Sequence, residues 1–149
     1  MYLIIIIFTL LDQIIKYVVV NNLFLGESIK VINNFFSITY VTNDGAAFNI
    51  LSGNKMFFIL LGVIITIFLI NYSKNKPKLE RFTYYLLISG IIGNLIDRII
   101  KGYVIDYLDF NIFGYNFPVF NFADICITIS AIMLLVIEVL ENGKNHRNN

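Results

Sequence analysis

Four long apolar runs constrain the fold of this chain more than any other feature of its sequence. They cover residues 3–20, 56–72, 82–100 and 123–140. A helix needs roughly 17 to 25 mostly apolar residues to cross ~30 Å of hydrocarbon, and each run has about that length. Because lipid offers no partner for free backbone groups, each run should be helical. The sequence therefore predicts an all-α integral membrane protein, with four transmembrane helices in one domain, residues 1–149.

Composition narrows the possible classes of function. Hydrophobic residues make up 58% of the chain, well above the usual share in soluble domains. The formal net charge is only +1, and the basic residues form no patch suited to nucleic acid. Cys126 is the only cysteine and His146 the only histidine of the sequence. We therefore expect no nucleic-acid partner, no disulfide and no metal site.

The positions of lysine and arginine predict the orientation of the chain. The connection 73–81 carries four basic residues, and the tail 141–149 carries two more. Short loops rich in these residues stay preferentially in the cytoplasm. We therefore expect both termini in the cytoplasm and the connections 21–55 and 101–122 on the extracytoplasmic side. The polar end of the tail, residues 142–149, is expected to be disordered.

The two outer connections carry different patterns. Residues 36–42 alternate residue types with strand period, are rich in β-branched and aromatic side chains, and end at Asn43-Asp-Gly. This pattern predicts a small β-structured extracytoplasmic cradle between helices 1 and 2. The second connection carries aromatic residues that suit the headgroup region: Tyr107, Phe110, Phe113, Tyr115, Phe117 and Phe120. We expect this connection to lie on the membrane.

Ionisable residues near hydrocarbon are costly and are therefore candidates for function. Asp12 and Lys16 are spaced i, i+4, so they share a helix face and can neutralise each other. Two interpretations stay open for this pair: an ion pair that holds the first helix against its neighbours, or a direct chemical role.

The third apolar run carries a polar stripe made of Gly90, Gly93, Asn94, Asp97 and Arg98. Their spacing places all five residues on one helix face. The glycines allow another helix to approach closely, while the polar side chains need partners in a dry setting. Taken alone, such a stripe is more typical of helix packing and helix-end anchoring than of catalysis.

Asp106 and Asp124 lie at the predicted outer boundary of the membrane. Asp106 follows the third run, and Asp124 opens the fourth, three residues after Asn121, a candidate N-cap. Both residues have explanations that involve no catalysis: Asp106 could be an exposed acid in a loop, and Asp124 could complement the positive end of a helix dipole. If the third and fourth helices are antiparallel neighbours, however, the two carboxylates converge. Two close carboxylates resist ionising together, so one can act as a base and the other as an acid.

The order of these motifs resembles the lipoprotein signal peptidase family, also called signal peptidase II, over essentially the whole chain. The matching blocks are Asp12-Gln-Ile-Ile-Lys16, Asn43-Asp-Gly-Ala-Ala-Phe48, Gly93-Asn-Leu-Ile-Asp-Arg98, Gly102-Tyr-Val-Ile-Asp106 and Phe120-Asn-Phe-Ala-Asp124. The resemblance implies an intramembrane aspartic endopeptidase of the bacterial cytoplasmic (inner) membrane. Such an enzyme removes signal peptides from prolipoproteins, on the N-terminal side of a diacylglyceryl-modified cysteine. It would act beside membrane lipid without a cofactor, and we expect a monomer.

The resemblance also implies roles for individual residues. Asp106 and Asp124 would be the catalytic dyad. A polar shell that orients the dyad, the water and the substrate would consist of Asn43, Gly45, Asn94, Arg98 and Asn121. Four residues would support that shell: Asp12, Lys16, Asp97 and Ala123.

The chain departs from the family pattern in two places. Ser89-Gly90-Ile91 stands where the family tends to have Gly-Gly-Ala, and Tyr107 stands where phenylalanine is usual. The first departure bears on how closely the third helix can pack. Neither departure touches the two aspartates.

Two alternatives come from other classes of protein. A small four-helix transporter would use Asp12, Asp97 and Asp124 as a proton or cation path. A membrane scaffold without chemistry would use its polar residues for assembly alone. A transporter favours acids near the middle of the membrane, whereas Asp97, Asp106 and Asp124 cluster toward one side.

Overall fold

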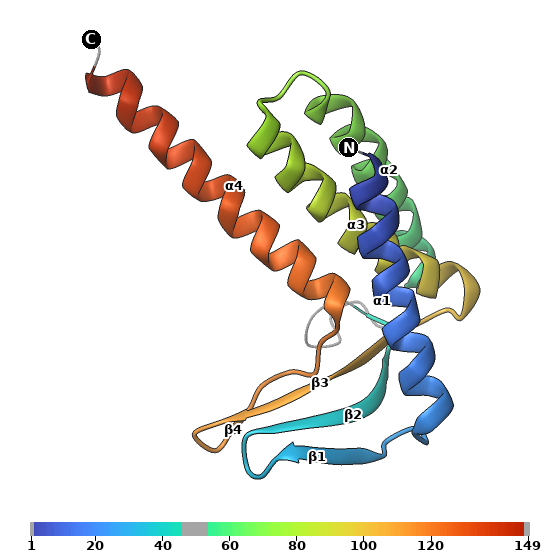
Figure 1. Cartoon of the computed structure of the whole chain (residues 1–149). Coiled ribbons are helices and arrows are strands. Elements are labelled where there is room, and N and C mark those ends of the chain that lie inside the picture. The colour runs from blue at the N-terminus through green and yellow to red at the C-terminus, as the bar shows by residue number, and fades with distance from the viewer. Residues whose placement is uncertain (1, 46–53, 148–149) are drawn as a thin grey trace.

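The structure, a computed structural model, describes the backbone of residues 2–45 and 54–147 and the side chains as far as Gly143. Residues 46–48, which end the predicted motif beginning at Asn43, lie outside the described residues. The helices are α1 (Tyr2–Asn22), α2 (Lys55–Ser73), α3 (Lys78–Ile100) and α4 (Phe122–Arg147), and a small sheet lies at one end of them (Figure 1). All four helices are long and apolar enough to cross a membrane, which confirms that prediction.

Two helices extend beyond the apolar runs from which they were predicted. α3 begins at Lys78 rather than at residue 82, because Pro77 is its N-cap and good helix formers follow. An ion pair of 2.8 Å between Lys76 and Glu80 stabilises this start. α4 continues to Arg147, so the expectation of a disordered tail is wrong for residues 142–147. Polar helix formers such as Glu141 let the helix run on past its apolar part.

α3 is the central helix, because it packs against α1, α2 and α4. Its two stripe glycines mark the closest contacts. A Cβ atom added at Gly90 would meet the backbone carbonyl of Ala123 on α4, and one added at Gly93 would lie 2.6 Å from Asp12 Oδ2 on α1. The predicted packing role of these glycines is therefore confirmed. Beyond this contact α4 diverges from the other helices toward its C-terminal end (Figure 1).

The sheet has the antiparallel order β1-β2-β3-β4. β1 (Ser28–Ile32) and β2 (Phe36–Asn43) come from the connection between α1 and α2. β3 (Val104–Ile112) and β4 (Tyr115–Asn116) come from the connection between α3 and α4. The prediction that placed the cradle between helices 1 and 2 alone is therefore not confirmed. A two-stranded hairpin is marginal by itself, and the second connection supplies the missing strands.

The sheet is held against the end of α1 by a small apolar core. Val19 of α1 and Leu23, which directly follows α1, pack there with Tyr40 of β2 and with Ile105 and Tyr107 of β3. These five side chains are all buried. Ile105 and Tyr107 directly flank Asp106 in the chain, so the packing of the sheet also determines where that carboxylate lies.

Candidate active site

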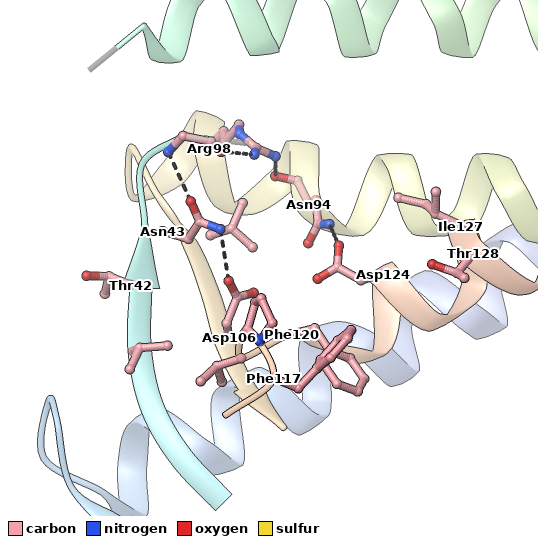
Figure 2. A pocket seen from close by; sticks show the side chains of 15 residues that line it. Thr42, Asn43, Asn94, Arg98, Asp106, Phe117, Phe120, Asp124, Ile127 and Thr128 are labelled. Atoms are coloured by element: carbon pink, nitrogen blue, oxygen red, sulfur yellow. Dashed lines mark hydrogen bonds between the residues drawn. The ribbon is translucent and has the colours of Figure 1, made fainter. Parts of the chain in front are cut away.

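A cavity of about 530 Å³ lies where the sheet meets α3 and α4. Asp106 from β3 and Asp124 from the first turn of α4 both line it (Figure 2). Asn43 comes from the end of β2, and Asn94 and Arg98 come from α3. The structure therefore brings the two aspartates to one shared space, although 18 positions separate them in the sequence.

Asp106 is only 3% exposed, and both of its carboxyl oxygens accept a hydrogen bond. Asn121 Nδ2 donates to Oδ1 at 2.6 Å, and Asn43 Nδ2 donates to Oδ2 at 3.1 Å. Burial, and after it the negative charge of Asp124, raise the pKa of Asp106 to about 6. The two hydrogen bonds oppose the rise because they favour the ionised form.

Asp124 is held by a reciprocal cap at the start of α4. Its backbone N–H donates to Asn121 Oδ1 at 2.9 Å, and the backbone N–H of Asn121 donates to Asp124 Oδ2 at 3.2 Å. This is the N-cap role predicted for Asn121. Asn94 Nδ2 donates to the remaining oxygen, Asp124 Oδ1, at 2.7 Å. Each of the four carboxyl oxygens of the two aspartates thus accepts a hydrogen bond.

Asn121 joins the two carboxylates into one network. Its side chain is fully buried, and its Nδ2 donates both to Asp106 and, at 3.1 Å, to Asn94 Oδ1. Asn94 in turn donates to Asp124. The two aspartates are therefore positioned by a continuous set of amides rather than by independent contacts.

Arg98 ties the end of β2 to α3. Its Nη2 donates to the Gly45 carbonyl at 2.9 Å, and its Nη1 donates to the Asn94 carbonyl at 3.4 Å. The Gly45 N–H donates to Asn43 Oδ1 at 3.0 Å, which fixes the Asn43 amide with its Nδ2 toward Asp106. Arg98 lines the cavity, and its buried Nε has no hydrogen-bond partner among the residues that the structure describes.

The remaining predicted residues lie behind the cavity wall. Lys16 is fully buried and forms ion pairs of 2.9 Å with both Asp12 and Asp97. Ala123 is also fully buried, and its N–H donates to Asp12 Oδ1 at 3.0 Å. The pair of Asp12 and Lys16 therefore joins helices, as one of its two interpretations held. Within the described parts of the chain, no three His, Cys, Asp or Glu residues are grouped to hold a metal ion.

The structure adds wall residues that the sequence did not assign to the site. Phe117, Pro118 and Val119, from the segment between β4 and α4, line the cavity together with Ile127 and Thr128 of α4. The aromatic residues of this segment were interpreted only as anchors in the headgroup region. Thr128 follows Asp124 by four positions, so a shared helix face was a signal that could have identified it. The other wall residues depend on the path of the chain and had no local signal.

Known proteins resemble this chain both in sequence and in fold. A family model described as signal peptidase (SPase) II matches residues 4–140. Lipoprotein signal peptidase from Staphylococcus aureus strain bovine RF122 / ET3-1 is 41% identical over 139 residues, covering 91% of this chain and 85% of that protein. Lipoprotein signal peptidase from strain JH9 of the same species has the same identity and coverage.

Two solved bacterial membrane enzymes share the fold. One, determined by the in meso method at 2.3 Å resolution, is 38% identical with a TM-score of 0.87, covering 96% of this chain and 88% of that chain. The other, at 1.9 Å resolution, is 40% identical with a TM-score of 0.81, covering 93% and 90%.

These findings decide between the classes of function left open by the sequence. The transporter alternative is wrong, because the matching family is one of peptidases. A scaffold without chemistry is excluded for the same reason. The chain therefore belongs to the signal peptidase II family, and it is a protease that processes prolipoprotein signal peptides in the bacterial inner membrane.

Proposed function

We propose that the protein is an aspartic endopeptidase in which Asp106 and Asp124 are the catalytic dyad. One observation carries this proposal: both carboxylates line one cavity and belong to one amide network. Catalysis by such a dyad needs two acids that share a proton and a space for water and a peptide bond between them. A cavity of about 530 Å³ has room for both.

The chemistry follows from the proton that the pair shares. The ionised carboxylate takes a proton from a water molecule, whose oxygen then attacks the carbonyl carbon of the scissile amide. The protonated carboxyl hydrogen-bonds to the carbonyl oxygen during this attack. A proton is then delivered to the amide nitrogen, the C–N bond breaks, and a new carboxylate and a free amine leave. The pair titrates as a unit, so neither residue has a fixed protonation state.

The cleaved bond in this proposal lies on the N-terminal side of a cysteine that carries a diacylglyceryl group. The signal helix would enter sideways from the lipid, because an unpaired peptide bond is costly in hydrocarbon. Polar side chains that line the cavity, such as Asn43 and Arg98, would pair carbonyls of the extended substrate. Apolar wall residues, among them Ile127 and Phe117, would contact its apolar groups.

The proposal includes an orientation and an oligomeric state. The cavity and the sheet would face the extracytoplasmic side, and both termini would lie in the cytoplasm. The N-terminal end of α1 and the C-terminal end of α4 lie at the end of the helices away from the sheet, which supports a common side for both (Figure 1). Both aspartates come from the same chain, so a monomer would contain the whole dyad.

The dyad is tested with purified protein in detergent and a lipidated pro-lipoprotein peptide. Asp106→Asn and Asp124→Asn should each reduce cleavage by about three orders of magnitude or more, because an amide neither accepts nor delivers the shared proton. Both variants should remain folded, as judged by their melting temperatures. Undiminished cleavage by either folded variant would exclude the dyad.

The lipid is tested with two peptides that differ only in the diacylglyceryl group on the cysteine. The unmodified peptide should be the poorer substrate, because it lacks the apolar group that binds beside the cavity. The comparison is made through kcat/KM for each peptide under the same detergent conditions. Equal values would remove the lipid from the recognition model while leaving the dyad in place.

A further inference from the structure

The ammonium group of Lys16 lies fully buried on α1, behind the wall of the cavity. An ammonium has three N–H donors. Each donor has one acceptor at 2.9 Å, and these acceptors are Asp12 Oδ2, Asp97 Oδ2 and Asn94 Oδ1. Every hydrogen of the group is therefore used, which fixes its orientation.

Two of these acceptors also hold the backbone next to the proposed dyad. Asp12 Oδ1 accepts the N–H of Ala123 at 3.0 Å, and Asp97 Oδ2 accepts the N–H of Ile105 at 3.2 Å. Ala123 and Ile105 each directly precede one of the two catalytic aspartates. Through its two carboxylate partners, the buried ammonium thus connects to both elements that carry the proposed dyad, the helix α4 and the strand β3.

Lys16 also determines the orientation of the Asn94 amide, the third acceptor. Asn94 Oδ1 accepts from Lys16 Nζ and from Asn121 Nδ2, while Asn94 Nδ2 donates to Asp124 Oδ1. A flipped amide would place its NH₂ group against the donors and its oxygen against the carboxylate. Because an ammonium can only donate, it excludes that flipped state.

We infer that Lys16 is the positioning residue of the dyad, acting on Asp124 through the amide of Asn94. Its carboxylate partners extend the same control to the backbone before each catalytic aspartate. The inference rests on the proposed function of the dyad. Lys16 touches neither the cavity nor a catalytic carboxylate, so its whole effect passes through other residues.

Lys101 offers a matched control on the same carboxylate. Its Nζ forms an ion pair of 2.8 Å with Asp97 Oδ1, the oxygen that Lys16 does not bind. Its side chain is 30% exposed, so the loss of its charge is screened by solvent. If the site only needed a positive charge beside Asp97, loss of either lysine would lower activity. If Lys16 acts by positioning Asn94, only the loss of Lys16 would do so.

The test compares Lys16→Gln with Lys101→Gln, using the purified full chain and the lipidated pro-lipoprotein peptide. Lys16→Gln should lower kcat by about tenfold or more with a smaller change in KM, because the dyad is displaced rather than the substrate site. Lys101→Gln should keep values close to those of the parent.

The pH profile of kcat/KM should also change in Lys16→Gln. Burial and then Asp124 raise the pKa of Asp106, and the charge of Lys16 opposes them. Among the described residues, Asp124 on α4 and Arg98 on α3 also carry charge near Asp106. Without Lys16 the profile should move to higher pH, a shift that loss of stability alone would not produce.

A second variant covers the possibility that Lys16→Gln does not fold. Asp12→Asn/Lys16→Met removes the buried pair together and keeps an oxygen to accept the N–H of Ala123. It should lose activity relative to Asp12→Asn alone.

A folded Lys16 variant with the parent's kcat and pH profile, or an equal loss in Lys101→Gln, would overturn the inference. If the parent cleaves and the dyad variants do not, such a result refutes the role of Lys16 and leaves the dyad intact.

Discussion

Single residues at this site differ in chemistry because their surroundings differ. Asp106 comes from a strand and is almost fully buried, whereas Asp124 caps a helix and is partly exposed. Burial, then the charge of Asp124, brings the pKa of Asp106 to about 6. The sequence identified both acids, but an acid in a loop has the same sequence whether it is exposed or buried. The raised pKa is therefore a property of the folded site.

The pKa of Asp106 predicts the pH dependence of cleavage. The kcat/KM profile should have an alkaline limb with an apparent pKa of about 6, since the dyad needs one proton. The hydrogen bond from Asn43 favours the ionised form, so Asn43→Ala should move this limb to higher pH and lower the rate. Ser37→Ala, on the same strand and paired with Asp109, serves as a control. A profile of Asn43→Ala that overlays the parent's would contradict this assignment.

At the scale of elements, the contact between α3 and α4 determines whether the proposed dyad can assemble. The glycine at position 90 leaves room for the carbonyl of Ala123, and this contact lies one residue from Asp124. Beyond this point α4 diverges from the other helices (Figure 1). The sequence predicted both helices and the packing role of the glycine stripe, but not which helix would pack at each glycine.

Gly90→Ala should therefore damage both stability and activity. The added Cβ would meet a backbone atom that cannot rotate away, and overpacking of this kind costs about 1–3 kcal/mol. We expect a lower melting temperature in detergent and slower cleavage of the lipidated peptide. Gly143→Ala on α4 is the control, because its Cβ has nothing within 4 Å. A Gly90→Ala variant as stable and active as the parent would mean that the two helices are not in close contact there.

At the scale of the whole molecule, one sheet unites two connections that lie far apart in the sequence. β2 pairs with β3 in a register that places Asn43 opposite Val104 and Val41 opposite Asp106. This pairing forms one wall of the cavity and closes it against α3 and α4 (Figure 2). The two predicted outer connections are therefore a single structural unit, and their common side of the membrane is required by the fold.

Labelling of single cysteines in intact cells tests the proposed orientation. Phe113→Cys lies at the tip of the sheet and Asn142→Cys near the end of α4, and both positions are exposed. A membrane-impermeant maleimide should label Phe113→Cys in intact cells and label Asn142→Cys only after permeabilisation. The parent gives the background, because Cys126 is buried. The opposite labelling pattern would invert the orientation.

The sequence by itself determined the four helices, because lipid requires apolar runs of sufficient length to form backbone hydrogen bonds internally. It also singled out Asp106 and Asp124, through their position at the ends of apolar runs and the resemblance of the surrounding motifs to a known family. Only the tertiary structure decided that β3 completes the sheet and that Asn43 donates to Asp106 across 63 positions. The physical reason is that spans depend on local composition, whereas the cavity and its hydrogen bonds depend on which distant segments pack together.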